Sequence, residues 1–217
     1  MTEQLRARLR ALPSFPAQLP AFDPEGAPRH PEALFLDWLD EAVNAGVPAP
    51  HAATLATTDT TGPSARVLIL KDLDESGWQI ATPADSRPGA AMGATGRAAL
   101  TFFWPQLGRQ VRVEGAATRA TDAEAAADFR ARPAEARATA LVGRPTATLT
   151  GETEYAHVRD AARARLAAAP ETVPDTWALW RITPGTVEFW QAAHDRAHIR
   201  LRYNRTADAW ARERLWP

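Results

Sequence analysis

Residues 66–82 read RVLILKDLDESGWQIAT and have the form of a β-hairpin. The run 66–71 is apolar between two cations, and 78–82 contains aromatic and β-branched residues, a composition that favours extended strands. Asp74 to Gly77 supplies turn-forming residues between the two runs. The segment therefore predicts two neighbouring antiparallel strands.

Short strand-like runs continue on both sides of this hairpin, and turn residues separate them. They are 54–58, 100–104, 110–114, 177–182, 187–191, 199–203 and 209–215. Helical patterns occur at 31–45, within 89–96, from the potential cap Asp122 to Phe129, and at 153–168. The order predicts a mainly β protein with helical additions, built as an antiparallel barrel or sandwich.

The first thirty residues differ from the rest of the chain. A short charged helical pattern runs to about Leu12, and five prolines follow between 13 and 28. Proline fixes φ and lacks an N–H, so residues 1–30 are expected to form an extended arm, with a disordered tail as the alternative. Residues 31–217 are expected to form one domain.

Composition excludes several classes of function. The formal net charge of −1 gives no global attraction to nucleic acid or an acidic membrane. The sequence has no cysteine, which removes disulfides, thiolate metal sites and a cysteine nucleophile. No metal site, secretory signal or apolar run of membrane-spanning length is expected, and a cytoplasmic location is the default.

Three clusters of cations are candidates for binding an anion. Arg196, His198 and Arg200 would share one face if the segment is extended, although a solvated strand edge gives the same pattern. Arg66 and Lys71 are separated by an odd number of positions, so an ideal strand directs them to opposite faces. The third cluster, Thr82 and Arg87, flanks a loop before a helix, where backbone N–H groups and a guanidinium suit a phosphate.

The order and spacing of these motifs resemble the pyridoxamine 5'-phosphate oxidases, which belong to the FMN-binding split-barrel family. The resemblance runs from about residue 31 to 217. It rests on RVLILK (66–71), T-x-x-x-S-R (82–87), FFWPQLGRQVRVEG (102–115), FRARP (129–133), VEFWQ (187–191), R-x-H-x-R (196–200) and the terminal AWARERLWP. It implies an antiparallel split β-barrel and a homodimer that holds FMN at its interface.

The resemblance assigns FMN contacts to residues in both halves of the chain. The implied set is Arg66, Val67, Lys71, Ala81, Thr82, Arg87, Gln110, Trp190 and Arg200. The FMN phosphate would be surrounded by Arg66, Lys71, Thr82 and Arg87. Val67 and Ala81 would contribute main-chain contacts. Gln110 would hydrogen-bond the flavin across the interface. Trp190 and Arg200 would contact the ring system from the partner chain.

The resemblance also implies the substrate contacts. Lys71 and Arg132 would bind the phosphate of a pyridoxine-type substrate, and Arg196 and His198 would act as catalytic residues beside the reacting C4' carbon. The implied reaction transfers a hydride from C4' to the flavin, after which O2 is reduced to H2O2. The products would be pyridoxal 5'-phosphate and peroxide, made from pyridoxine or pyridoxamine 5'-phosphate.

The sequence departs from the family pattern at four positions. Asp128 stands where a phosphate-binding tyrosine is expected, and Ala136 replaces a serine. Pro88 replaces a basic residue and Pro145 a glutamine near the flavin. Asp128 and Ala136 favour an alternative: a flavin oxidase of secondary metabolism, similar to the phenazine-biosynthesis oxidases, which acts on an unphosphorylated ring. The retained cations and histidine, Lys71, Arg132, Arg196 and His198, favour the phosphorylated substrate. A flavin- or haem-binding module without turnover is a third possibility.

Overall fold

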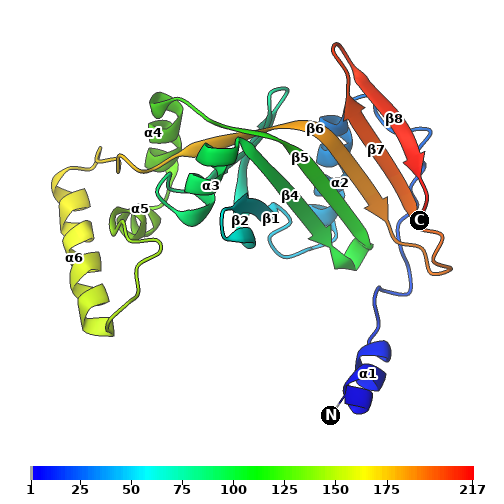
Figure 1. Cartoon of the computed structure of the whole chain (residues 1–217), viewed down its shortest axis with the longest axis horizontal. Coiled ribbons are helices and arrows are strands. Elements are labelled where there is room, and N and C mark those ends of the chain that lie inside the picture. The colour runs from blue at the N-terminus through cyan, green and yellow to red at the C-terminus, as the bar shows by residue number, and fades with distance from the viewer. Residues whose placement is uncertain (1) are drawn as a thin grey trace. The chain divides into compact units, whose positions relative to one another are not determined.

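The computed structural model describes residues 2–217 and contains within them eight strands, six α-helices and a short 3-10 helix at Pro105–Leu107 (Figure 1). The strands are β1 (Ala52–Asp59), β2 (Gly62–Asp74), β3 (Gly77–Ala81), β4 (Arg97–Trp104), β5 (Arg109–Arg119), β6 (Leu179–Gln191), β7 (Ile199–Arg205) and β8 (Trp210–Leu215). The helices are α1 (Thr2–Arg10), α2 (Pro31–Asn44), α3 (Arg87–Thr95), α4 (Asp122–Ala131), α5 (Ala134–Leu141) and α6 (Glu152–Ala168).

All eight strands belong to one sheet with the order β3-β2-β1-β4-β5-β6-β7-β8. An additional antiparallel pairing between β3 and β6 joins Trp78 to Ile182 and Ala81 to Leu179. This pairing closes the first six strands into a barrel, and β7 and β8 continue the sheet beyond β6 as an antiparallel hairpin. The prediction of a mainly antiparallel split barrel with helical additions is confirmed.

The chain forms two compact units. One comprises the residues up to Ala53 together with Thr101–Val113 and Gly185–Pro217, and the other comprises Thr54–Leu100 and Glu114–Pro184. We call them the C-terminal-hairpin unit and the α3–α6 unit, after the elements that each contains. Each unit has its own aromatic core, so the residues around each candidate site are held by local packing.

Large aromatic rings fill the core of the C-terminal-hairpin unit. Phe189 lies edge-on to Trp38 at 5.2 Å and to Tyr203 at 5.7 Å between ring centroids. Phe35 makes a similar contact with Phe102 at 4.7 Å. Because α2 contributes Phe35 and Trp38 from its apolar stripe, this helix packs against the strands that carry the other rings.

The α3–α6 unit has a core cluster made by α4 and the start of β6. Phe129 and Trp177 pack edge to face at 5.4 Å between centroids, together with Ala125 and Leu179. Helices α5 and α6 contact each other beside this cluster (Figure 1). The cluster fixes the end of α4, where residues implicated in substrate binding lie.

The proline-rich residues after α1 are extended and contact the C-terminal-hairpin unit. The Tyr203 hydroxyl donates to the Pro28 carbonyl at 2.8 Å, and an imidazole nitrogen of His194 lies 3.2 Å from the Ala17 carbonyl. Phe15 lies 5.8 Å from the ring of Trp190. These contacts join the proline-rich residues to β6, β7 and the segment between them, within the same unit.

Some expected elements differ from the observed ones. The separate strands at 177–182 and 187–191 are one strand, β6, which continues through Thr183 and Pro184. A Cβ on Gly115 would lie 2.0 Å from the Thr183 carbonyl oxygen, so the glycine permits the close approach that keeps β6 continuous. The cap of α4 is Thr121 and not Asp122, because Thr121 and Glu124 form a reciprocal capping box.

Helix α5 was missed by the sequence prediction. It follows Pro133 directly, and its eight residues include four alanines but only a weak apolar stripe. Such a short helix depends on tertiary packing, here against α6, more than on its own periodicity.

Candidate cofactor and substrate site

Arg66 is fixed by the strands around it in the α3–α6 unit. Its guanidinium donates to the Thr57 hydroxyl at 2.9 Å, to the Ser64 hydroxyl at 2.6 Å and to the Leu55 carbonyl at 3.3 Å. Partial burial, and then the positive charge of Arg87, lower the pKa of Arg66 below its ordinary value. Arg66 is bonded to Thr57 and Arg87 to Asp59, two positions apart on β1, so the two guanidinium groups lie on neighbouring parts of the same strand.

The loop before α3 is held in place by two hydroxyl groups and by close packing of the helix. Ser86 caps α3 by accepting a hydrogen bond from the Gly89 N–H at 3.2 Å, and its hydroxyl lies 3.0 Å from that of Thr82. A Cβ on Gly89 would approach the Pro83 carbonyl oxygen to 2.1 Å, so α3 packs directly on the loop. Ser86 was not identified from the sequence, although serine before a helix is a capping signal.

Arg87 is the first residue of α3 and is paired with Asp59. Its Nε lies 2.8 Å from the Asp59 carboxylate, and one terminal nitrogen donates to the Thr61 hydroxyl at 2.8 Å. Donation by Arg87 and then by Thr61 lowers the pKa of Asp59 well below its ordinary value. Pro88 follows within the first turn, where a missing N–H costs no helical hydrogen bond.

The apolar members of the implied FMN set lie on the adjacent strands. Val67 is 65% exposed on β2, and Ala81 is the last residue of β3, opposite Leu179. Lys71 lies where the pairing of β2 with β3 is irregular, between Leu70 and Asp72. An exposed valine in the middle of a strand leaves an apolar surface that suits a flat ring.

Lys71 and Arg132 are brought to the same group of residues, as the resemblance requires, but Asp128 lies among them. The Lys71 Nζ is 3.6 Å from one oxygen of the Asp128 carboxylate. The other oxygen of this carboxylate accepts a hydrogen bond from the Trp177 indole N–H at 3.0 Å. The Arg132 guanidinium stacks on Trp177 at 4.2 Å from the ring centroid. Burial lowers the pKa of Arg132, and the Asp128 charge opposes this shift.

The other two departures lie on the segment that follows. Ala136 is on α5, and Pro145 lies in the turn between α5 and α6. Arg144 beside it pairs with Glu154 of α6 at 2.7 Å. None of the described contacts joins Ala136 or Pro145 to the Lys71 group.

The second group of implied residues lies in the C-terminal-hairpin unit. Trp190 on β6 and Arg200 on β7 are directly opposite each other in the antiparallel register. The His198 ring lies 4.8 Å from the Trp190 ring. The structure thus brings together a planar aromatic surface, a guanidinium and an imidazole.

Glu188 orients the guanidinium of Arg200 and was not identified from the sequence. It is 4% exposed, and its two oxygens accept from Arg200 Nε at 2.9 Å and from Arg112 at 2.7 Å. Arg200 also donates to the Trp216 carbonyl at 3.0 Å. Glu188 lies two positions before Trp190 in VEFWQ. Strand alternation alone would have predicted that the two side chains lie on the same face.

The idea that 196–200 forms one extended face is wrong. Strand β7 begins only at Ile199, and Arg196 lies in a turn with φ of 69°. The His198 Nδ1 accepts a hydrogen bond from the Ala193 N–H at 3.0 Å. In the neutral ring the proton is therefore on Nε2, which makes His198 a hydrogen-bond donor toward a ligand.

Gln110 lies on β5 beside a buried anchor. Its neighbour Arg109 is 2% exposed and donates to Gln191 at 2.9 Å and to Glu41 at 2.8 Å. Gln110 itself is half-buried. The Arg109–Gln191 bond links the strand that carries Gln110 to the strand that carries Trp190.

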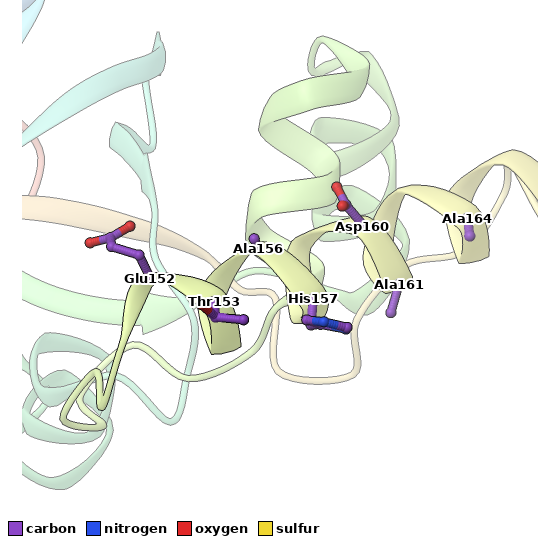
Figure 2. Close-up of a pocket in the computed structure, with 7 residues that line it drawn as sticks. All are labelled: Glu152, Thr153, Ala156, His157, Asp160, Ala161 and Ala164. Carbon is purple, nitrogen blue, oxygen red and sulfur yellow. The ribbon is translucent and has the colours of Figure 1, made fainter.

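Only some of the hollows on the described surface contain implied site residues. A hollow of about 680 Å³ runs along α6 and is lined by alanines together with Glu152, Thr153, His157 and Asp160 (Figure 2). It contains none of the implied site residues. Another, of about 490 Å³, contains Arg87 and Asp59. The candidate site is therefore identified by its cations and hydrogen-bond donors, and not by the volume of a hollow.

Two further observations concern residues 2–217 as a group. No cluster of histidine and carboxylate residues there is suited to hold a metal ion. None of the helices described is long and apolar enough to cross a membrane.

Comparison with known proteins gives a consistent result over most of the chain. Residues 39–191 match the profile described as pyridoxamine 5'-phosphate oxidase, and residues 177–217 match the pyridoxine 5'-phosphate oxidase C-terminal dimerisation region. A relative named pyridoxine/pyridoxamine 5'-phosphate oxidase from Pseudomonas paraeruginosa is 39% identical over 194 residues, 88% of this chain and 90% of the relative. One of the same name from Thermosynechococcus vestitus is 39% identical over 198 residues, with the same coverage of both chains.

Solved structures agree with this comparison. PhzG from Burkholderia lata, crystallised with tetrahydrophenazine-1-carboxylic acid, matches with a TM-score of 0.82 and 28% identity, covering 94% of this chain and all of that one. A pyridoxamine 5'-phosphate oxidase-related, FMN binding protein from Nostoc punctiforme has a TM-score of 0.70 at 16% identity, covering 87% of this chain and 98% of that one. The latter shows a shared fold alone.

Proposed function

Because the chain belongs to the pyridoxamine 5'-phosphate oxidase family, we propose that it is an FMN-dependent oxidase that makes pyridoxal 5'-phosphate from pyridoxine or pyridoxamine 5'-phosphate. One observation carries the proposal. Arg66 and Arg87 are bonded to Thr57 and Asp59, two positions apart on β1, and Trp190 lies opposite Arg200 in the pairing of β6 with β7, which supports a cationic group in one unit and an aromatic–cationic group in the other. These match the two ends of FMN, a phosphate and a tricyclic ring.

The cationic group fits the phosphate end. Arg66 is held by its own strands, and Arg87 begins a helix whose first N–H groups face the same loop. Two guanidinium groups that repel each other gain most from a dianion between them. Arg66 and Arg87 would therefore bind the phosphate, and the Thr82 hydroxyl would complete the cradle.

The aromatic–cationic group fits the ring end. Trp190 offers stacking area, and Arg200 is held beside it by Glu188. We propose that Trp190 and Arg200 of the partner subunit reach the flavin, while Gln110 bonds it across the interface. The match of residues 177–217 to a dimerisation region supports a homodimer.

When bound, FMN would supply the redox chemistry: the two electrons and the hydrogen of the C4' hydride, together with the proton that the substrate releases, would reduce O2 to H2O2. The residues of this chain position the substrate. Arg196 and His198 would lie against the C4' substituent, with the His198 Nε2–H donating to its oxygen or nitrogen. For the alcohol substrate, loss of the C4' hydride and of the hydroxyl proton yields the aldehyde.

A second candidate is an oxidase for an unphosphorylated ring, as in secondary metabolism. Asp128 favours it, because a carboxylate 3.6 Å from Lys71 opposes a phosphate at the same place. The likeness to PhzG over the whole of that chain is also in its favour. In either case we propose a cytoplasmic enzyme with a small-molecule substrate and no nucleic-acid or membrane partner.

Oxygen consumption separates the candidates. The purified protein is first tested for a yellow colour and for FMN released on denaturation. Peroxide production is then measured with pyridoxine 5'-phosphate, pyridoxamine 5'-phosphate and a dihydrophenazine. Turnover of the first two supports the main proposal, and turnover of only the third supports the second candidate. Bound FMN without any turnover would indicate a binding module, and a protein that takes up no FMN would refute the flavin assignment.

A further inference from the structure

We propose that Asp128 is a specificity-determining residue that turns the substrate-tail subsite away from phosphate and toward an uncharged hydroxymethyl group. The subsite is the group formed by Lys71, Asp128, Arg132 and Trp177 in the α3–α6 unit. The inference rests on the proposed FMN-dependent oxidase and concerns which of its two candidate substrates the tail subsite fits. It predicts that unphosphorylated pyridine alcohols bind this protein with an affinity comparable to that of their phosphate esters.

The Asp128 carboxylate already pairs with Lys71, the cation that a phosphate would use. The Lys71 Nζ lies 3.6 Å from one Asp128 oxygen, and the two side chains are 30% and 14% exposed. A partly buried pair of this kind is screened less by solvent than a surface pair. A phosphate at Lys71 would have to accept the repulsion of Asp128 or separate the pair.

Asp128 is not free to move away. Its second oxygen accepts from the Trp177 indole N–H at 3.0 Å, and Trp177 is packed edge to face against Phe129 in the core of the unit. Asp128 itself is on α4, whose C-terminal turn carries Phe129. Moving the carboxylate therefore requires a lost hydrogen bond in a partly buried place.

Arg132 remains available on the other side of Trp177. Its guanidinium stacks on the indole at 4.2 Å, and its buried Nη1 makes no hydrogen bond to any described residue. Such an orphan donor is suited to a ligand oxygen. A hydroxymethyl group can accept from Arg132 and donate to Asp128, whereas a phosphate dianion has no proton to donate to the carboxylate.

The test compares binding of two ligands that cannot react. 4-Deoxypyridoxine and its 5'-phosphate lack the C4' oxygen that is oxidised, so their dissociation constants on the FMN-loaded protein need no turnover. Asp128→Asn removes the charge and keeps an oxygen that can accept from Trp177. We expect it to tighten binding of the phosphate at least about tenfold and to change binding of the free alcohol by less than about threefold.

Two further variants make the result specific. Asp128→Glu retains the charge and should retain the wild-type ratio of the two affinities. Asp122→Asn removes one charge from the exposed first turn of the same helix, and should leave that ratio unchanged. FMN content and melting temperature are measured for every variant, so that misfolding is recognised.

The proposal is overturned if Asp128→Asn leaves the ratio unchanged, if Asp128→Glu changes it as much as the asparagine does, or if the wild type binds neither ligand. It is also overturned if the wild type binds the phosphate more than about tenfold tighter than the alcohol. Failure of the proposed function is a separate outcome, because a protein without FMN or without oxidase turnover is detected before any ratio is compared.

Discussion

Replacement of Arg109 by methionine tests whether one buried cation holds the strands that present Gln110 and Trp190. Arg109 is 2% exposed and donates to Gln191 at 2.9 Å and to Glu41 at 2.8 Å. Its guanidinium also lies 4.2 Å from the Trp38 ring. Methionine fills most of the same volume, so the polar interactions are the main loss.

The expected cost follows from these contacts. The buried Gln191 oxygen loses a charged donor, which costs about 1.5–3 kcal/mol. The cation–π contact with Trp38 contributes about 0.5–2 kcal/mol. Glu41 is 50% exposed, so its pair with Arg109 is screened and contributes at most about 1 kcal/mol. The free energy of unfolding should therefore fall by about 2–6 kcal/mol.

The assay is urea unfolding of the apoprotein, followed by tryptophan fluorescence at one fixed protein concentration because a dimer's stability depends on concentration. Arg97→Met, at an exposed position in β4, is the control and should change stability by less than about 0.5 kcal/mol. FMN affinity should fall several-fold in Arg109→Met, since Gln191 is next to Trp190. A loss of less than about 1 kcal/mol would refute the assignment of Arg109 as an anchor.

Three other predictions follow from the two groups of residues. Glu188→Gln removes a buried carboxylate shared by two arginines and should weaken FMN binding about tenfold, measured by fluorescence titration, while an unchanged affinity would contradict its orienting role. His198→Ala should lower kcat by at least about tenfold and leave FMN affinity within about twofold, and equal losses in both would place this residue in cofactor binding instead. The pKa of Asp59 is lowered by Arg87, so their pair stabilises the fold above the ordinary pKa of 3.8 and is lost as the pH falls below it. The melting temperature of Asp59→Asn should be lower than that of the wild type at pH 6, and the difference should shrink as the pH falls through about 4; a difference independent of pH would contradict this.

The fold was predictable because local and global signals agree. The hairpin at 66–82 has strand residues, turn residues and alternation that all favour the same pairing, and β2 and β3 pair there as expected. The closure of the barrel by β3 and β6 was not visible in the residues themselves. This pairing joins positions about a hundred residues apart. A closed barrel was predicted only because the sequence resembles a family of split barrels.

The candidate site was predictable to different degrees. A residue with a distinctive neighbourhood, such as Trp190 in VEFWQ, could be singled out from the sequence, and the structure places it opposite Arg200 in the pairing of β6 with β7. The expectation that Arg196 shares a face with Arg200 failed because Arg196 lies in a turn with positive φ before β7 begins, and alternation applies only to continuous β-structure. The environment of Asp128 depends on Trp177, which is distant in sequence, so no local pattern could have predicted it.

The two cationic groups of the α3–α6 unit each contain one aspartate, and the difference between these aspartates explains why one group suits phosphate better. Asp59 is bonded to Thr61 in an exposed turn, and its partner Arg87 is 46% exposed. An incoming dianion can therefore replace this carboxylate at Arg87 while Asp59 returns to water and to its local hydrogen bond. Asp128 is fixed to an indole in the protein core and has no comparable solvated position. A carboxylate that can be displaced leaves an anion site usable, whereas one that is fixed selects against anions at the same site.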